Sequence, residues 1–480
     1  MSGENIKHYA RLVATPVEYL VRLESAVRRS LTWSHGTEYS AIRDKIIELC
    51  DACKSKIFDD AVLFRKIYTE DDLGDQILST PDELAVRALL RSTAGTFTAL
   101  HELLLFLPRE SIRPELRAYC ECLFRDEFQS TELSLILTSL FNAFEYSLDD
   151  VMRFLEADVF KFKIPDPKAL SFGNVMELAI VDRNNPLAWA VLAHEFGHFL
   201  DHHNGLTKRA VQEFSSKSAT PYPDEFIRAL ERLCTEIVAD LTGYYLHGPC
   251  SILPLVNMSI LIGCIQEPPI KFDGEHGAPT TRIEMVRKLC AEDNISITRI
   301  TPQLDTLIVE EGQKEAALPP EERERRTLIH GFLTEFFDQV RPVILAELGR
   351  RSFTRFTAEH YRRANVLSDR LALGLPIGAS RMHEDEKIAD ALHRAAGNPK
   401  SLRDEYSLLE EQAASVSEVI TAGWIHRVEH TPSLYGQSFT QSTQEGVFTS
   451  IASGLERQDE LLFKSIAMIP MLESFHAPTR

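Results

Sequence analysis

The chain has 480 residues with 52 basic and 71 acidic side chains, giving a formal net charge of −19, and it is long enough for two or three domains with buried cores. The sequence contains no basic run and no basic platform interleaved with aromatic residues, which argues against nucleic acid as a partner. Its amino terminus lacks the apolar core of a secretion signal, so we expect a cytoplasmic protein.

Residues 1–160 carry repeated helical patterns and predict an all-helical amino-terminal region. The segments Thr15-Pro16-Val17-Glu18 and Thr80-Pro81-Asp82-Glu83 both have the sequence of a capping box with proline in the first turn. Apolar residues follow at helical spacing, as in Leu84, Leu89 and Leu90. Each segment therefore predicts the start of a helix.

Eight cysteines are scattered through these and later helical patterns. In a long chain of this kind, reduced thiols are favoured over a disulfide framework. Cys50 with Cys53, and Cys120 with Cys122, have spacings that could hold a second metal ion. Both pairs lie in helix-like runs instead of knuckle turns, so we interpret them as helix-packing residues.

Residues 161–295 depart from the purely helical pattern. Pro165 and Pro167 interrupt it, and Val175–Val181 then predicts a short strand. A strand beside an active site can pair with the backbone of an extended peptide substrate. A short hairpin that only packs on the following helix is equally compatible with the sequence.

The next predicted helix carries the motif around which the chain is organised. Asn185 is a suitable N-cap, Pro186 a suitable first helical residue, and Asn204-Gly205 a left-handed stop. Ala190, Ala193 and Gly197 are small, which would allow another element to approach closely. We therefore expect a helix over residues 186–203 with a close neighbour.

His194 and His198 lie four residues apart on this helix, so both imidazoles project from one face and can hold one metal ion. Glu195 lies beside them. Zinc held by imidazoles lowers the pKa of a bound water to about 7, and a neighbouring carboxylate can accept its proton as the water attacks a carbonyl. The motif therefore indicates a metallohydrolase.

A second helix, predicted from Pro223 to the stop at Gly248-Pro249, supplies two acidic residues. Glu236 and Asp240 share one face in an otherwise apolar neighbourhood. Glu236 can complete a His2Glu zinc site, and Asp240 can orient a ligating histidine. Between the two helices, residues 206–222 are polar and predict a loop able to line a cleft.

The order H-E-F-G-H and then E-I-V-A-D resembles the gluzincin zinc metallopeptidases, most closely their CAAX-prenyl-protease-like branch. The resemblance implies a zincin-like core that binds Zn2+ through His194, His198 and Glu236, with Glu195 as general base and Asp240 beside a ligating histidine. It also implies a protein or peptide substrate. A metzincin is excluded because the positions of its glycine and third histidine hold Asp201 and Asn204.

The segment Glu275–Ile283 resembles the H-P-x-x-x-x-R-I stretch of the same branch, with Gly277 in place of the usual proline. Peptide hydrolysis also needs a donor for the developing oxyanion. The candidates for transition-state or substrate contacts are Tyr244, Tyr245, His247, His276 and Arg282. The sequence does not decide among them.

After Asp240 no charged residue occurs before Glu267. Prolines interrupt this run, and the stretch from about Leu255 to Ile265 is shorter than the roughly 20 residues that cross a bilayer. We expect a buried helix behind the site and no membrane span.

Residues 296–480 return to helical patterns, first near Leu318–Glu322 and last over Leu455–Ile469. Leu375–Gly378 and Gly397–Pro399 predict loops. The expected fold is mainly α: a zincin-like metallopeptidase core with a short β element at 161–295, flanked by helical regions at 1–160 and 296–480. The oligomeric state is left open.

Two alternatives compete with this interpretation. His426–His430 has the inverted order H-x-x-E-H, but Thr431-Pro432 should end its helix and few residues remain to supply a third ligand. The metal could also stabilise a non-catalytic helical module that recognises a protein partner. Three ligands with Glu195 favour an open catalytic site, whereas a fourth ligand such as His202 or His247 would favour the module.

Overall fold

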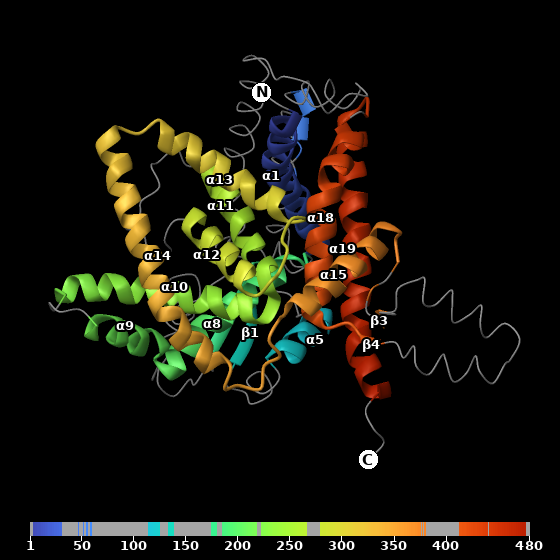
Figure 1. The fold of residues 1–480 in the computed structure, drawn as a ribbon. Helices are drawn as coiled ribbons and strands as arrows, with labels where there is room; N and C mark the ends of the chain where they lie inside the picture. The colour runs from blue at the N-terminus through green and yellow to red at the C-terminus, as the bar shows by residue number, and fades with distance from the viewer. Residues whose placement is uncertain are drawn as a thin grey trace, which may run out of the picture.

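The structure of the protein is a computed structural model, and the part that it describes is mainly helical (Figure 1). The described residues are 3–30, 47, 51, 54–55, 58–59, 114–124, 133–138, 174–179, 185–217, 222–265, 279–375, 377, 379–380, 412–439 and 441–476. Within these ranges, no helix combines the length and the apolar character that a membrane span requires.

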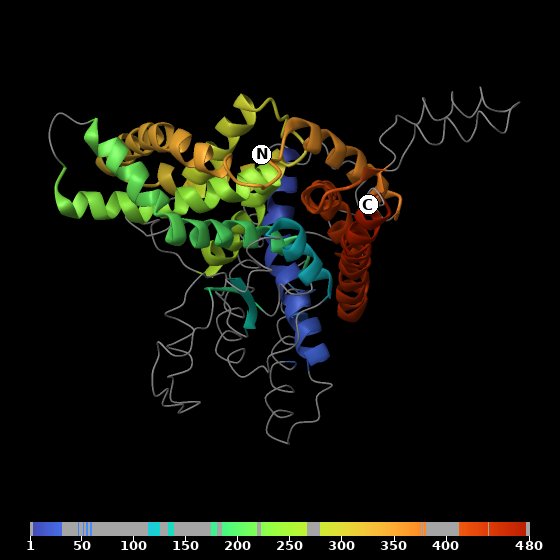
Figure 2. The same cartoon turned by 90° about the horizontal axis from the view of Figure 1, so that it is seen from below.

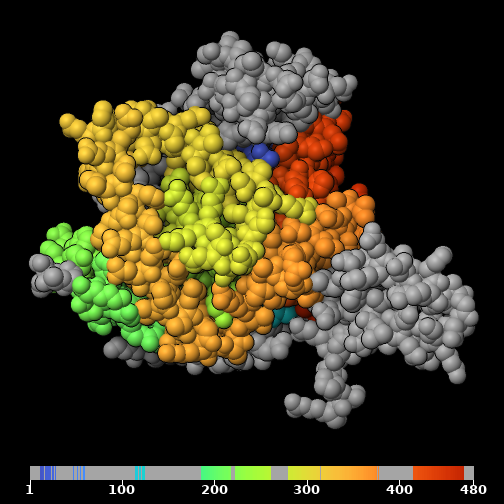
Figure 3. Space-filling view, viewed as in Figure 1, coloured from blue at the N-terminus to red at the C-terminus, as the bar shows by residue number. Residues whose placement is uncertain are grey.

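The described helices follow the chain from its amino-terminal to its carboxy-terminal residues. They are α1 (Gly3–Ser30), α5 (Pro114–Leu123), α8 (Val191–Asn204), α9 (Leu206–Ser216), α10 (Asp224–His247), α11 (Leu253–Ile265), α12 (Pro279–Glu292), α13 (Thr301–Ala316), α14 (Pro320–Leu348), α15 (Ala358–Ala372), α18 (Val416–Phe439) and α19 (Gln444–His476). Two 3-10 turns, η1 (Ala188–Ala190) and η2 (Gly248–Ile252), precede α8 and α11. Helices α12, α13 and α14 form much of the face seen in Figure 3.

Four short strands accompany the helices. β1 (Leu133–Thr138) pairs in parallel with β2 (Asn174–Ala179), with Leu133 opposite Asn174. β3 (Ala379–Ser380) pairs antiparallel with β4 (Gln412–Ala413). β2 contacts α8, so this pair of strands lies beside the helix that carries the H-E-F-G-H motif (Figure 2).

α8 and α10 make the most extensive helix–helix contact among the described elements. Gly197 permits it, because a Cβ at this position would lie 2.5 Å from the Cα of Ala239. Real Cβ atoms do not approach another backbone atom so closely, so a larger residue would push the helices apart. The small residue inside the motif thus sets the separation of the two helices.

The predicted start of α8 is wrong. Residues 185–187 form a turn, η1 follows, and the α-helix begins only at Val191. The turn is covered by the core, since Leu187 and Trp189 are 1 % and 0 % exposed, and this packing outweighs the local preference for a capped start. The predicted end is confirmed, because Gly205 has φ 58° and ψ 40°.

The predicted loop over residues 206–222 is also wrong, because α9 occupies most of it. The Asp201 carboxylate accepts hydrogen bonds of 2.7 Å from both the backbone N and the side-chain Oγ1 of Thr207. Leu206, Ala210 and Phe214, spaced four residues apart, are buried. A capped amphipathic helix therefore lies within a segment whose overall composition is polar.

Two helices continue through prolines that were expected to delimit them. α1 runs through Pro16, with Leu12 and Val17 buried on either side, and α18 runs through Pro432. A proline inside a helix costs about 3 kcal/mol, so tertiary packing of the apolar faces must outweigh it. The segment Thr80–Glu83 lies outside the described residues.

The flanking regions pack on the centre of the chain and on each other. α1 contacts α18 and α19 from the other end of the sequence, as Figure 1 shows, and α5 contacts α19. Buried residues from all three predicted ranges belong to a single hydrophobic core. The uncharged run covers the end of α10, η2 and α11, and Leu253 and Val256 of α11 are buried.

Candidate metal centre

α8 and α10 bring two imidazoles and a carboxylate together. His194 Nε2 lies 3.5 Å from Glu236 Oε2, and His198 Nε2 lies 3.7 Å from Glu236 Oε1. His194, Glu195 and His198 also offer ligand atoms within 4.8 Å of one another, and they are the only such group of His, Cys, Asp or Glu side chains in the described ranges. Glu236 thus contacts both imidazoles, one through each carboxylate oxygen, although the group within 4.8 Å contains Glu195 and not Glu236.

Asp240 and Arg282 form a chain of contacts behind His194. His194 Nδ1 donates to Asp240 Oδ1 at 3.0 Å. Arg282, on α12, donates from Nε to Asp240 Oδ2 at 2.6 Å and from Nη2 to Asp240 Oδ1 at 2.5 Å. Its Nη1 lies 3.6 Å from Glu236 Oε2. Asp240 is therefore held on one side by a bidentate guanidinium and contacts His194 on the other.

The site is buried, and among the described residues its carboxylates outnumber its cations. His194, Glu195 and Glu236 are 5 %, 3 % and 8 % exposed. Three carboxylates share one guanidinium, which leaves two negative charges when both imidazoles are neutral. Buried charges of one sign are costly without a partner, so this arrangement is electrostatically suited to a divalent cation.

The two imidazoles have opposite proton affinities in the metal-free protein. Burial opposes protonation of His194, but hydrogen bonds to Asp240 and Glu236 outweigh it and raise its pKa to about 9. Burial, reinforced by the charge on His194, lowers the pKa of His198 to about 4. Burial also opposes ionisation of Asp240, but Arg282 and His194 outweigh it and lower the pKa of that carboxyl.

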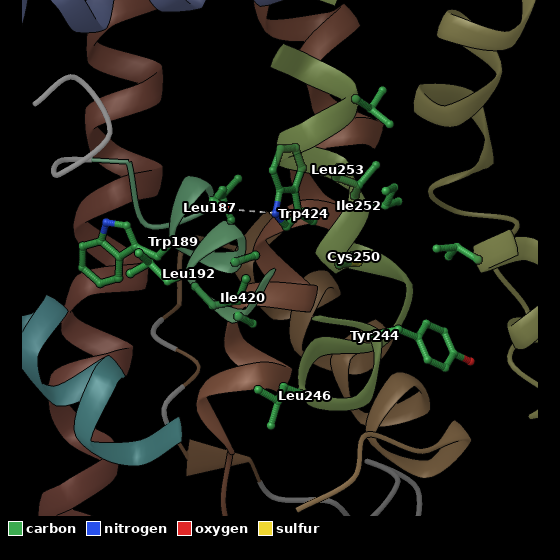
Figure 4. Close-up of a cluster of buried hydrophobic side chains, with 14 of the residues drawn as sticks. Leu187, Trp189, Leu192, Tyr244, Leu246, Cys250, Ile252, Leu253, Ile420 and Trp424 are labelled. Carbon is green, nitrogen blue, oxygen red and sulfur yellow. Dashed lines mark hydrogen bonds between the residues drawn. The ribbon is translucent and has the colours of Figure 1, made fainter. Parts of the chain in front are cut away.

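The described candidates for substrate or transition-state contacts lie in different environments. Tyr244 donates from its hydroxyl to Asp293 Oδ2 at 3.0 Å, and Figure 4 shows its ring pointing away from Trp189 and Leu192. Tyr245 is buried, and its carbonyl accepts a hydrogen bond of 2.8 Å from Phe356 N. His276 lies outside the described residues.

His247 is fully buried and engaged by α5. Its Nε2 lies 2.7 Å from the hydroxyl of Tyr119, and the two rings stack with centroids 5.7 Å apart. Among the five candidates, only Arg282 contacts the His194, Glu236 and Asp240 group in the described part of the chain. It holds Asp240 by two hydrogen bonds, and its Nη2 lies 3.5 Å from His194 Nδ1.

Among the described residues, the rival motif at residues 426–430 belongs to no metal-binding group. Arg299 donates from Nε and Nη2 to both oxygens of Glu429 at 2.5 Å. The carboxylate is therefore used in a bidentate ion pair that joins the start of α13 to α18. The helix also continues beyond the motif, contrary to the expected end at Pro432.

Cys120 and Cys122 on α5 form no disulfide and belong to no metal-binding group in the described ranges. Cys50 and Cys53 lie outside those ranges. The expected role of Cys120 in packing agrees with its complete burial.

Two residues near the site could not be recognised from the sequence. Tyr119 and Trp424 both donate hydrogen bonds to backbone carbonyls in the turn that precedes α8. They lie 70 and 237 residues from their partners, so no local pattern could reveal these contacts. The only indication in the sequence is the residue type, because a buried tyrosine or tryptophan usually needs a hydrogen-bond partner for its polar atom.

Comparisons with known proteins identify no relative for this arrangement. No protein-family model, curated protein or solved structure matches the chain.

Proposed function

We propose that this protein is a zinc-dependent metallopeptidase in which His194, His198 and Glu236 hold the metal and Glu195 acts as general base. The observation that carries the proposal is the convergence of two imidazole Nε2 atoms on the two oxygens of Glu236, at 3.5 and 3.7 Å. The convergence joins two helices at a buried point, and a Glu follows the first histidine directly.

The donor set fits zinc. Two imidazole nitrogens and one carboxylate form the protein ligand set of many catalytic zinc sites. The two net negative charges around this point would be neutralised by one divalent ion. Bound zinc would supply a Lewis acid that polarises the scissile carbonyl and makes water acidic near neutral pH.

The side chains of the site have distinct roles in this proposal. The Asp240 carboxylate accepts a hydrogen bond from His194 Nδ1, and Nε2 is then the imidazole nitrogen that faces Glu236. Glu195 takes a proton from the attacking water and returns it to the leaving amine. Burial of Glu195 removes competing solvent from this proton transfer.

A non-catalytic metal module is the second candidate function. The two histidines that could have supplied a fourth ligand lie elsewhere: His247 contacts Tyr119, and His202 is exposed on the last turn of α8. Within the described ranges, the site therefore has three candidate ligands beside Glu195. This arrangement favours an open site, in which substrate can reach the metal.

The test combines metal analysis with hydrolysis of a quenched fluorescent peptide mixture. We expect about one zinc per wild-type chain, loss of zinc in Glu236→Ala, and retention of zinc in the control His426→Ala. Glu195→Gln should keep zinc and lose about 100- to 10,000-fold in rate. Zinc without hydrolysis in the wild type would favour the module, and zinc that survives Glu236→Ala would refute the assigned site.

A further inference from the structure

The turn that leads into α8 is held by aromatic side chains from both flanking regions. Trp424 on α18 donates from Nε1 to the carbonyl of Leu187 at 3.0 Å, as the dashed line in Figure 4 shows. Tyr119 on α5 donates from its hydroxyl to the carbonyl of Trp189 at 2.7 Å. Both donors are buried, at 3 % and 0 % exposed. Two carbonyls two residues apart are thus fixed from different sides.

Tyr119 also reaches the end of the second metal-binding helix. Its one hydroxyl proton is used by the Trp189 carbonyl, so the hydroxyl oxygen must accept from His247 Nε2 at 2.7 Å. His247 is then neutral with its proton on Nε2. Burial supports this state by lowering its pKa to about 3. One hydroxyl therefore links the beginning of α8 to the last residue of α10.

This link completes the geometry of the α8–α10 pair. The close approach at Gly197 and Ala239 fixes the distance between the helices at one point. A second close approach lies nearer the amino-terminal end of α8, where a Cβ at Gly243 would lie 3.8 Å from the backbone N of His194. The contacts at Trp189, in the 3-10 turn before α8, and at His247, the last residue of α10, add a restraint on the crossing angle at this end of the helix pair.

We propose that Tyr119 and Trp424, the aromatic clamp, are positioning residues for the metal site. The proposal rests on the proposed function. The ligands come from two helices, His194 and His198 from α8 and Glu236 from α10, so a change in crossing angle alters the distances between donor atoms. Metal–ligand distances tolerate only about 0.2 Å of deviation. The clamp makes the site sensitive to the docking of α5 and α18.

The test is a titration of the full-length, metal-free chain with Co²⁺, whose visible absorption reports coordination geometry. We expect Tyr119→Phe to bind Co²⁺ about 10-fold more weakly and with a changed spectrum, since residues that orient metal ligands typically contribute 10- to 100-fold to affinity. Trp424→Phe should act in the same direction.

Two controls separate positioning from general stability. Tyr435→Phe removes a buried hydroxyl that has no hydrogen-bond partner in the described ranges, and it should leave affinity and spectrum unchanged. Ile344→Val trims the core of α14 and should lower thermal stability without altering the spectrum.

The outcomes distinguish the two proposals. A wild-type chain that binds no Co²⁺ would overturn both the proposed function and the clamp. A wild-type chain that binds Co²⁺ with the same affinity and spectrum as Tyr119→Phe would overturn the clamp alone. A spectrum that changes equally in Ile344→Val would also overturn it, because loss of stability would then explain the effect. Nitrogen-15 spectra of histidine-labelled protein add an independent check: the signal of His247 should be that of a neutral imidazole protonated on Nε2, and it should shift in Tyr119→Phe.

Discussion

Two buried groups of charged side chains join helices in this protein, and they differ in charge balance. The first, here called the ion cluster, consists of Glu18, Arg22, Arg427 and Asp459. Arg22 donates to Asp459 Oδ2 at 2.5 Å and to Glu18 Oε1 at 2.9 Å, and Arg427 contacts both carboxylates. Two carboxylates meet two guanidiniums, so the ion cluster is neutral and joins α1 to α18 and α19.

The proposed metal centre is buried to a similar degree, but among the described residues its carboxylates outnumber its cations. Glu195, Glu236 and Asp240 share one guanidinium, that of Arg282, and two imidazoles face Glu236. The comparison shows that burial of charge does not by itself mark a functional site. The two groups differ instead in the ratio of carboxylates to cations among the described residues, and an excess of carboxylates is what a cation site would need.

The largest expected effect is a loss of folding stability when the ion cluster loses one of its carboxylates. Asp459→Asn leaves Arg22 and Arg427 with one carboxylate, so we expect a loss of about 3–5 kcal/mol in the free energy of unfolding. Urea denaturation checks this loss, and metal content per folded chain should not change. Paired replacement with Arg22→Leu and Asp459→Leu should cost less than the sum of the single changes. If the double replacement costs as much as the two single replacements together, the interpretation of the ion cluster as a balanced group is wrong.

The same kind of change should act differently in the metal centre. Glu236→Gln removes one excess carboxylate, so the metal-free protein should be no less stable than the wild type. Its affinity for Zn²⁺ should fall at least about 100-fold, more than for a residue that only orients a ligand. Competition with a chromophoric chelator measures the affinity. A marked loss of stability in the metal-free variant would show that the site is balanced after all.

Substitutions of Arg282 test its hydrogen bonds to Asp240, the residue that contacts His194. Arg282→Gln frees Asp240 and increases the excess negative charge, so His194 loses its fixed orientation. We expect Zn²⁺ affinity to fall about 10- to 100-fold, equivalent to about 1.4–2.8 kcal/mol. Arg282→Lys keeps the charge without the bidentate geometry and should retain part of the affinity. Equal effects of the two variants would assign the role of Arg282 to charge alone.

Acid tests one carboxyl of the ion cluster, through a change in unfolding free energy of at most about 1.4 kcal/mol per pH unit. Burial opposes ionisation of Glu18, but Arg427 and Arg22 outweigh it and lower its pKa from 4.5 to about 2. Its contribution to stability is therefore complete above pH 4.5 and is lost as the pH falls toward 2. The difference in unfolding free energy between wild type and Glu18→Gln should be constant above pH 4.5 and shrink below it.

Burial raises the pKa of Asp459, so the ion cluster takes its first proton on that carboxyl as the pH falls. Wild type and Glu18→Gln share this contribution, so subtracting one stability curve from the other leaves the contribution of Glu18. Glu460→Gln, on the exposed face of α19, is the control and should not alter the shape of the curve. A difference that persists unchanged to pH 2 would contradict the assignment to Glu18.

Local sequence determined the parts of the protein that depend on spacing along one helix. The four-residue spacing of His194 and His198, and of Glu236 and Asp240, predicted which side chains share a face. The stops at Gly205 and at Gly248 also followed from backbone chemistry, since both have positive φ. The mainly helical fold followed from periodicity.

Tertiary structure decided where local preferences were opposed by packing. α1 and α18 pass through Pro16 and Pro432, and α9 forms in a polar segment, because burial of apolar faces outweighs the local signals. It also decided which distant groups meet. Arg282 lies behind Asp240 and Tyr119 lies between Trp189 and His247, and neither contact leaves a periodic trace in the sequence, because each depends on how separate helices dock.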